Sequence, residues 1–362
     1  MPTGTRLVIA GGGTGGHVFP ALALASALRQ RLPGSELLFI GAGNRPEAGL
    51  VPSAGWPFVG IAAAGLRGKK WFSFIINLVI LPVGVVQSLY HLVRFWPQLV
   101  IGMGGYVSGP VVAAAWLLRR KVAIHEQNLT PGWTNSLLGR LADLVMVSFT
   151  ETELCFPRRK VAVTGTPVRD EALGNEVPAR EDGLFHLLVL GGSQGAVSLN
   201  RMFVNAMERL TLKSLSVRHQ TGPADEEWIR EAYGKMDLEA EVVPFITEMG
   251  NSYRWADLVV CRSGASTIAE LTVNGCPAIL VPFPWSAGGH QGENARYLAE
   301  KGAALMIEDR GGDSSEILAV EIEGLMRDRG KRKDLSEASR GLSRPGAADD
   351  MAEACLRVVS GG

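Results

Sequence analysis

The residues with the clearest chemical potential lie between positions 256 and 270. The apolar run Leu258–Cys261 is typical of a strand buried in a parallel sheet. After it, Ser263 stands where an N-cap is expected, Gly264 lets a phosphate approach the backbone, and a helix is predicted over 265–271. A helix start presents unpaired N–H groups and the positive end of the helix dipole, so this turn suits a diphosphate.

Glu270 lies two turns beyond Ser263 on the same side of the predicted helix. A carboxylate there could accept hydrogen bonds from both hydroxyls of a ribose whose phosphates sit at the helix start. The alternative is an ordinary strand-turn-helix with a solvated glutamate. This stretch alone does not decide between the two interpretations.

A second glycine-rich loop opens the chain, between a strand predicted over Arg6–Ala10 and a helix predicted from about Pro20 to Arg31. Its glycines satisfy G-x-G-x-x-G, but a dinucleotide site also wants an acidic residue at the end of the second strand. The second predicted strand, 37–40, ends instead in Gly-Ala-Gly-Asn. A nicotinamide enzyme is therefore not the first choice, and the loop is interpreted as a backbone cradle for a sugar or a pyrophosphate.

His17 follows that loop directly. A histidine at a glycine-rich turn can serve as a general base, because its pKa lies near neutrality. The alternative is a histidine that only hydrogen-bonds to loop carbonyls.

Further polar residues stand at predicted strand ends, where open α/β sheets bind ligands. Glu126, Gln127 and Asn128 follow the strand predicted over 122–125, and together they suggest recognition of a polyhydroxyl ligand. A turn with capping residues is a reasonable alternative for Glu126. In the second half, Ile246 follows a predicted strand where the main chain could bind the edge of a planar base.

Gln291 and Asn294 are three residues apart near the start of another predicted helix, where both could hydrogen-bond a sugar.

The order of elements predicts the fold class. Strand, glycine loop and helix recur at 186–210, so the α/β chain is predicted to form two Rossmann-like parallel-sheet domains that face across a cleft. The first domain is expected over 1–165 and the second over 166–345, with a last helix after Pro345. A length of 362 residues fits two domains.

Composition narrows the class of protein. Hydrophobic residues make up 46% and charged residues 20%, as in a globular protein. The four cysteines show no metal or redox spacing and are interpreted as reduced thiols, and no secretory signal is expected. Residues 1–165 hold 15 Lys and Arg against 6 Asp and Glu, whereas the remainder holds 21 against 30, so an acidic partner is expected for the first half.

Residues 71–90 carry no charge. An uncharged segment of this length is long enough for a transmembrane helix. Pro82, Gly84 and the location of the segment inside the first domain favour an apolar helix-turn-helix instead. Arg119 and Lys121 lie further along the chain, and basic side chains around an apolar surface are what a monotopic membrane contact requires. A core helix beside a solvated basic loop is the competing interpretation.

Seven ordered motifs make the chain resemble a known family. They are Gly-Gly-Thr-Gly-Gly-His-Val-Phe-Pro at 12–20, Gly-Leu-Arg-Gly at 65–68, Gly-Met-Gly-Gly-Tyr at 102–106, His-Glu-Gln-Asn at 125–128, Gly-Gly-Ser-Gln-Gly-Ala at 191–196, Arg-Ser-Gly-Ala at 262–265 and His-Gln at 290–291. Together they resemble the MurG family, the glycosyltransferases that make lipid II in bacterial cell-wall synthesis, over nearly the whole chain.

The resemblance implies a GT-B fold and transfer of N-acetylglucosamine from UDP-N-acetylglucosamine to the C4 hydroxyl of the muramyl sugar of lipid I. The anomeric centre inverts, so a single in-line displacement is expected. The resemblance also implies that the last helix, at about 346–362, packs back on the first domain. The donor-binding positions implied by the family are Thr14, Gly15, Gly16, Asn128, Arg169, Ser193, Ile246, Ala265, Ser266, Thr267, Ile268, Ala269, Glu270 and Gln291. Positions expected to contact the acceptor or the membrane are Gly104, Gly105, Tyr106, Arg67, Lys69, Lys70, Trp71, Phe74 and Ile75.

For the chemistry, His17 is the first choice of base and Glu126 the second. The helix start near Ser263, with Ser193, is expected to stabilise the leaving UDP without a metal, and no cofactor is expected. The acceptor pyrophosphate is expected near the glycine loops at 13–16 and 102–105. Two departures from the family stand out: Thr166 replaces its usual asparagine before Pro-Val-Arg, and the loop at 285–289 lacks its acidic pair.

Expected partners are the two substrates and the anionic cytoplasmic face of the cell membrane, with other cell-wall synthesis and division proteins implied by the resemblance. Three other classes stay open: another lipid-directed GT-B transferase, an epimerase of UDP-N-acetylglucosamine, and a scaffold that binds nucleotide-sugar. No nucleic-acid recognition module is present in the sequence.

Overall fold

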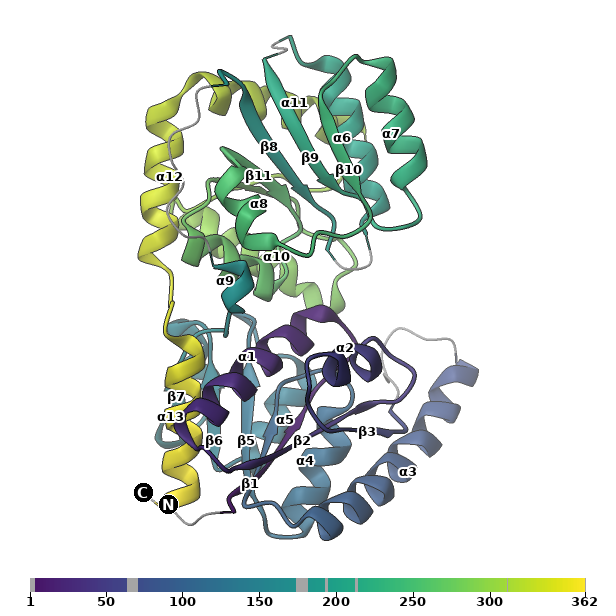
Figure 1. Cartoon of the computed structure of the whole chain (residues 1–362), viewed down its shortest axis with the longest axis vertical. Coiled ribbons are helices and arrows are strands. Elements are labelled where there is room, and N and C mark those ends of the chain that lie inside the picture. The colour runs from purple at the N-terminus through teal and green to yellow at the C-terminus, as the bar shows by residue number, and fades with distance from the viewer. Residues whose placement is uncertain are drawn as a thin grey trace. The chain divides into compact units, whose positions relative to one another are not determined.

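The computed structural model describes residues 4–63, 71–173, 182–192, 195–211, 214–310 and 312–361, with only the backbone described at 71–79, 287, 312 and 313. The chain forms two compact units, unit 1 (Met1–Arg169 with Pro345–Gly362) and unit 2 (Asp170–Arg344) (Figure 1).

Unit 1 is built on a parallel sheet in the order β3-β2-β1-β4-β5-β6-β7. The strands are apolar runs, as expected for a sheet that is covered on both faces. Because the order reverses between β1 and β4, the loops that follow these two strands lie side by side at the sheet's switch point. The strands are β1 Arg6–Ala10, β2 Glu36–Ala42, β3 Phe58–Ile61, β4 Leu99–Gly102, β5 Lys121–Glu126, β6 Leu144–Val147 and β7 Val161–Val163.

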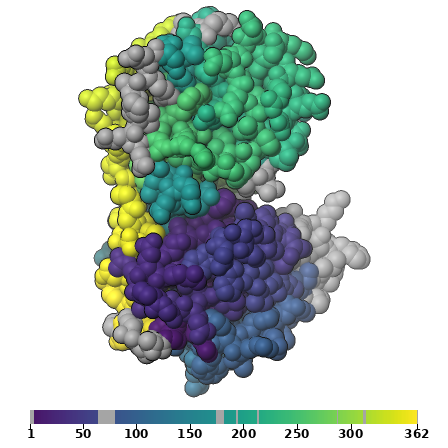
Figure 2. Space-filling model, in the orientation of Figure 1, coloured from purple at the N-terminus to yellow at the C-terminus, as the bar shows by residue number. Residues whose placement is uncertain are grey.

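Alternate residues of β1 point to opposite faces of that sheet and enter two separate cores. Leu7 and Ile9 pack with α1 and α13, whereas Val8 and Ala10 pack with α4. In Figure 2 the yellow residues of α13 lie beside the purple N-terminal residues of this unit. The helices are α1 Gly15–Arg31, α2 Glu47–Ser53, α3 Trp71–Phe95, α4 Ser108–Leu117, α5 Trp133–Leu141 and α13 Ala347–Ser360, with short 3-10 turns at Thr150–Cys155 and Arg158–Lys160.

Unit 2 repeats the design with the order β10-β9-β8-β11-β12-β13, and its switch point lies between β8 and β11. The strands are β8 Phe185–Leu190, β9 Leu215–Gln220, β10 Ala240–Val243, β11 Leu258–Cys261, β12 Ala278–Leu280 and β13 Leu305–Met306. The helices are α6 Val197–Arg209, α7 Glu226–Lys235, α8 Met249–Trp255, α9 Ala265–Asn274, α10 His290–Glu300, α11 Gly312–Arg327 and α12 Arg329–Gly341, with 3-10 turns at Asp170–Ala172 and Ala287–Gly289.

The predicted class, two Rossmann-like parallel sheets, is confirmed. Several local predictions are wrong. Helix α1 begins at Gly15 rather than near Pro20, so Pro20 lies inside it. The predicted helix-turn-helix is one helix, α3, which continues through Pro82. The strand predicted just before Ile246 ends earlier, at Val243, so Ile246 lies in the loop beyond it.

None of the helices in the described ranges combines the length and hydropathy needed to cross a membrane.

Candidate functional site

His17 is the third residue of α1, at the switch point of the unit 1 sheet. Its Nδ1 lies 3.1 Å from the carbonyl oxygen of Met103, in the loop after β4. A carbonyl oxygen only accepts, so this contact assigns the proton to Nδ1 and leaves the lone pair on Nε2. Burial lowers the pKa of His17 against the opposing charges of Glu126 and Glu47, so the ring is neutral near pH 7.

Gln127 contacts the same imidazole ring. Its side-chain nitrogen lies 3.1 Å from Nδ1 of His17, while its oxygen is buried with no partner among the described residues. With a proton on Nδ1, turning the amide over brings the oxygen to Nδ1–H, which removes a contact between two donors. Gln127 therefore acts on the orientation of the imidazole.

Glu126 is 2% exposed, at the carboxyl end of β5. Its oxygens accept hydrogen bonds from the N–H groups of Asn128 and Gly132 and from the side-chain amides of Asn128 and Asn135, at 2.9–3.1 Å. Four donors saturate the acceptor sites of a carboxylate. This geometry fits the capping alternative for Glu126 and argues against its choice as the second candidate base.

Arg169 and Thr166 lie beyond β7. The Arg169 guanidinium stacks on the ring of Phe19 of α1, with 3.7 Å between the guanidinium carbon and the ring centroid. Its Nε is buried without a partner among the described residues. Thr166, the departure from the family pattern, is buried with its hydroxyl 2.6 Å from that of Ser148, which also contacts His125. The hydrogen bond between the Thr166 and Ser148 hydroxyls thus connects the segment after β7 to the end of β6.

Glu47, which the sequence did not single out, is fully buried at the first turn of α2. Its carboxylate accepts the N–H of Gly13 at 3.1 Å and 3.0 Å and the N–H of Ala42 at 3.1 Å. The Gly13 N–H is therefore engaged within the protein, and the expectation that it holds an acceptor phosphate does not fit this geometry. The sequence signal that could have identified Glu47 is its position, an acidic residue five positions after β2 in a predicted Rossmann-like domain.

The second glycine loop of unit 1 also uses its backbone internally. Gly104 donates its N–H to the hydroxyl of Ser108 at 3.0 Å, and its carbonyl accepts from the same hydroxyl. The N–H groups of Gly104 and Gly13 are therefore both hydrogen-bonded within the protein. Gly105 has φ +78°, and Tyr106 beside it is exposed. Thr14, Gly15 and Gly16, at the start of α1, have no capping side chain and remain the part of these loops suited to an anion.

In unit 2, the helix after β11 begins at Ala265 with Gly264 as its N-cap, and no side chain caps it. The prediction of Ser263 as N-cap is wrong, because its buried hydroxyl donates to the carbonyl of Gln291 at 2.8 Å. The N-terminal end of α9 is therefore open to an external acceptor. Side chains at 266, 267, 269 and 270 are half-buried, whereas Ala265 and Ile268 face the core.

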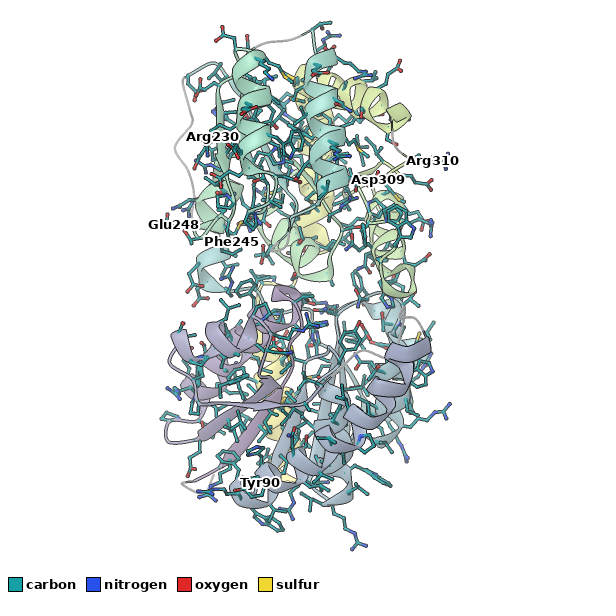
Figure 3. All side chains as sticks on the ribbon, turned by 90° about the vertical axis from the view of Figure 1, so that its right-hand side faces the viewer. Tyr90, Arg230, Phe245, Glu248, Asp309 and Arg310 are labelled. Carbon is teal, nitrogen blue, oxygen red and sulfur yellow. The ribbon has the colours of Figure 1, made fainter. Side chains whose placement is uncertain are left out.

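Glu270 lies on α9 and accepts a hydrogen bond from Tyr253 of α8 at 2.8 Å. This bond fixes the direction of its carboxylate. Burial raises the pKa of Tyr253 well above its usual range, so the phenol stays a donor. Ile246, in the loop after β10, is buried, while its neighbour Phe245 is exposed; Figure 3 labels Phe245 on this loop together with Glu248.

Gln291 is the second residue of α10, and its side-chain oxygen accepts the N–H of Phe283 at 2.9 Å. Asn294 is fully buried, with its amide 3.4 Å from the carbonyl of Ser263. The expectation that Asn294 contacts a sugar is therefore wrong. In the loop at 285–289, the exposed Trp285 packs edge-on against Phe283.

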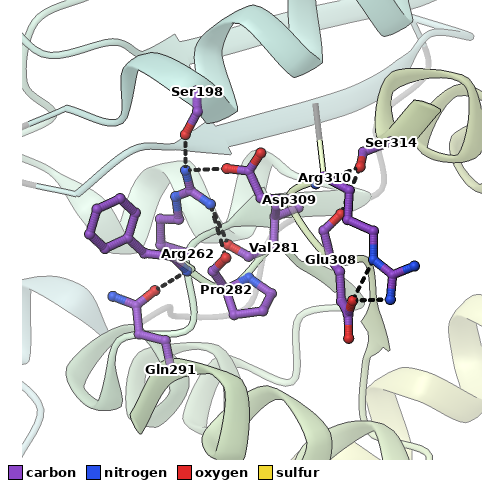
Figure 4. A network of polar contacts seen from close by, with 10 residues as sticks. Ser198, Arg262, Val281, Pro282, Gln291, Glu308, Asp309, Arg310 and Ser314 are labelled. Atoms are coloured by element: carbon purple, nitrogen blue, oxygen red, sulfur yellow. Dashed lines mark hydrogen bonds and ion pairs between the residues drawn. The ribbon is translucent and has the colours of Figure 1, made fainter. Parts of the chain in front are cut away.

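Arg262 holds the strand ends of this site together (Figure 4). Its guanidinium donates to the carbonyls of Val281 and Pro282, to the hydroxyl of Ser198 at 2.6 Å, and to Asp309 at 2.9 Å. Both charged side chains are nearly buried, so the pair depends on these bonds to offset its desolvation.

Some predicted positions lie outside the described residues: Arg67, Lys69, Lys70 and Ser193. Trp71, Phe74 and Ile75 are described in backbone only, within α3. Over the described ranges, no group of three or more His, Cys, Asp or Glu side chains is arranged to hold a metal ion.

The two Rossmann-like units, one with a neutral histidine and the other with an uncapped helix start at the switch points of their sheets, correspond to the two domains of a glycosyltransferase family. The glycosyltransferase family 28 N-terminal domain matches residues 7–147, and the family 28 C-terminal domain matches residues 186–351. The chain belongs to the MurG family of these enzymes.

Among its relatives is the UDP-N-acetylglucosamine--N-acetylmuramyl-(pentapeptide) pyrophosphoryl-undecaprenol N-acetylglucosamine transferase of Nitrosococcus oceani, 46% identical over 98% of this chain and 99% of the relative. The protein of the same name from Anaeromyxobacter sp. is 44% identical over 98% and 93%. The crystal structure of Acinetobacter baumannii MurG matches with a TM-score of 0.77 and 30% identity, over 98% of this chain and 99% of that chain. A putative UDP-N-acetylglucosamine 2-epimerase from Listeria monocytogenes, 13% identical with a TM-score of 0.71 over 97% and 96%, shares the fold.

Proposed function

We propose that this enzyme transfers N-acetylglucosamine from UDP-N-acetylglucosamine to the C4 hydroxyl of the muramyl sugar of lipid I, forming lipid II. Relatives named for this transfer match it along nearly their whole length. The observation that carries the chemistry is the contact of His17 Nδ1 with the Met103 carbonyl oxygen, 3.1 Å long, from which a proton on Nδ1 and a basic Nε2 are assigned.

The donor is assigned to unit 2. The diphosphate of UDP accepts hydrogen bonds from the open N–H groups at the start of α9, where the helix dipole favours negative charge. Glu270, oriented by Tyr253, accepts from the ribose hydroxyls. The main chain at Ile246 binds the edge of the uracil. This arrangement stabilises the charge that develops on the leaving UDP with protein dipoles, so the proposal requires no bound metal ion.

The reaction is one displacement. Nε2 of His17 takes the proton from the C4 hydroxyl as the oxygen attacks the anomeric carbon of N-acetylglucosamine. The bond from that carbon to the phosphate oxygen breaks, and its electron pair leaves with UDP. The anomeric centre inverts, and no covalent glycosyl-enzyme forms. Glu126, saturated by the loop it organises, acts on His17 through its negative charge.

The test is release of UDP from UDP-N-acetylglucosamine in detergent, with and without a lipid I analogue. Wild type should release UDP only with the acceptor. His17→Ala should lower kcat by about 10²- to 10⁴-fold with donor affinity retained, the usual range for a lost general base. His91→Ala, at a half-buried histidine of α3, is the control and should match wild type.

Two results would redirect the proposal. Acceptor-dependent release that survives in His17→Ala would keep the transfer and remove the base. Conversion of the donor without any acceptor would replace the transfer with epimerisation, the chemistry named for one structural neighbour.

We also propose that unit 1 docks on the anionic cytoplasmic face of the membrane through α3 and the end of α4. Val83, Val86, Tyr90 and Val93 are exposed at helical spacing along one face of α3. These four residues, with the exposed Trp96, Trp116 and Leu117, form the membrane face; Figure 3 labels Tyr90.

Basic side chains border this face, as contact with anionic lipid requires. The Arg120 guanidinium lies 4.1 Å from the centre of the Trp96 ring, and Arg94 and Arg119 are exposed nearby in the chain. The sequence located the face on α3 but did not single out Trp116, whose place beside α3 depends on the packing of the two helices.

Co-sedimentation with anionic vesicles tests the docking. Val86→Asp should weaken binding, and binding should fall as salt rises, because exposed charges are screened. Val320→Asp is the matched control, since Val320 of unit 2 is 66% exposed and Val86 is 65% exposed. Equal binding by the two variants, or binding that does not respond to salt, would remove the proposal.

A further inference from the structure

We propose that Glu47 is a positioning residue for the transfer: it clamps the first glycine loop of unit 1 and supplies part of the negative charge that acts on His17. The idea rests on the proposed function, in which His17 is the base. Glu47 sits on α2, a different element from those that carry His17 and Met103, and the transfer chemistry above assigns it no role.

The clamp follows from three short contacts. Both oxygens of Glu47 accept the Gly13 N–H, at 3.1 Å and 3.0 Å, and one of them also accepts the Ala42 N–H at 3.1 Å. The side chain thereby joins the end of β2 to Gly13, which lies four residues before His17. Gly13 has φ +92°, a left-handed conformation that glycine adopts readily and that the clamp holds in place.

The surrounding glycines are shaped to this carboxylate. A Cβ on Gly12 would lie 2.0 Å from an oxygen of Glu47, so a larger residue at position 12 would displace the carboxylate. A Cβ on Gly41 would lie 2.6 Å from the Phe58 ring and 2.8 Å from Cγ of Glu47, so Gly41 leaves room for both side chains. The glycine-rich loop therefore makes room for an acidic side chain of the protein itself, at a point where such loops otherwise hold a phosphate.

The charge is the second part of the role. Glu47 is fully buried, so its field reaches His17 with little screening. Three titratable groups act on this imidazole: Glu47 from α2 and Glu126 from the end of β5 favour its protonated form, and His125 of β5 is also coupled to it. Burial lowers the pKa of His17, and both carboxylates raise it, which makes the imidazole a stronger base than burial alone would leave it.

Two substitutions separate the clamp from the charge. Glu47→Gln keeps the shape and removes the charge, and it places an NH2 group against one of the two N–H donors. Glu47→Asp keeps the charge but is one methylene too short to reach both donors. Glu353→Gln, at an exposed residue of α13, is the control.

The experiment is an NMR titration of the histidine rings in the free enzyme, with His17 assigned from His17→Gln, followed by kcat against pH. We expect Glu47→Gln to move the His17 titration, and the acid limb of kcat, to lower pH, and to lower kcat about 10- to 100-fold through misplacement of the loop. We expect Glu47→Asp to titrate like wild type but to lose kcat. Glu353→Gln should change neither.

An unmoved His17 titration in Glu47→Gln would overturn the role of the charge, and a full kcat in Glu47→Asp would overturn the clamp. If Glu47→Gln does not fold, as judged by circular dichroism, Glu47→Asp still decides the clamp. The titration needs no substrate. A failure of His17 as the base would appear separately, as full activity in His17→Gln, and a failure of the transfer would appear as wild-type enzyme that releases no UDP in response to the acceptor.

Discussion

Gly104→Ala tests the placement of the base without altering the base itself. Gly104 has φ +100°, and a Cβ there would lie 2.6 Å from Nδ1 and 2.7 Å from Cε1 of His17. Ordinary contacts between such atoms are roughly 3.5 Å or longer, so the ring must withdraw by roughly 0.9 Å. That movement lengthens the 3.1 Å contact with Met103, which fixes the tautomer.

The size of the effect follows from this displacement. A misplacement of about 1 Å costs on the order of 10²-fold in rate, or about 2.7 kcal/mol of transition-state stabilisation. The left-handed backbone adds about 1–2 kcal/mol of strain for alanine, which lowers the stability of unit 1. The donor diphosphate is proposed to bind unit 2, so we expect donor affinity to stay the same.

The assay measures acceptor-dependent UDP release at saturating donor and acceptor, with UDP affinity measured in parallel by calorimetry. Gly109→Ala is the matched control, because its Cβ would meet nothing nearer than the Thr134 methyl at 3.8 Å. A Gly104→Ala enzyme with kcat within about 3-fold of wild type would refute the reasoning, since a displaced base at 10²-fold cost could not give that rate.

Three further predictions concern unit 2. Tyr253→Phe frees Glu270 from its 2.8 Å bond, so KM for the donor should rise about 5- to 10-fold with kcat little changed, measured by initial rates. Asp309→Ala leaves the buried Arg262 charge without its ion-pair partner, so the free energy of unfolding should fall by about 3–5 kcal/mol. The measurement is the urea midpoint, and an unshifted midpoint would show that the pair contributes little to stability. Burial lowers the pKa of His219 to about 3, so only the unfolded state takes up this proton between about pH 6.5 and 3. This group should therefore lower stability by about 1.4 kcal/mol per pH unit as the pH drops through that window, and the pH slope of urea unfolding between about pH 6.5 and 5 should be smaller by about that amount in His219→Gln than in wild type.

Local sequence patterns predicted much of the framework. The strands Arg6–Ala10 and Leu258–Cys261 have the predicted bounds, because each is a mostly apolar run followed by glycine or arginine. The start of α1 was missed, since Gly15 and Gly16 resemble loop and only the tertiary structure makes them helical. Strands β3 and β13 were missed because they are short and lie at sheet edges.

The site was predicted less completely than the framework, because side-chain partners are not local. The Ser263 hydroxyl bonds to a carbonyl 28 residues away rather than to its own helix. Glu47 and Gly13 are 34 residues apart in the sequence, and no local spacing pattern predicts the hydrogen bond between them. Glu126 was correctly placed at a strand end, but the four donors that surround it could not be inferred from its neighbours in sequence.

The position of α13 has a consequence for synthesis on the ribosome. Met351 and Cys355 are fully buried in the core beneath α1, yet they are made after all of Asp170–Arg344. A nascent chain that has completed unit 2 therefore still exposes the apolar surface that α13 covers. Unit 2, continuous in sequence, can reach its final packing first, and unit 1 closes its core only when the last helix emerges.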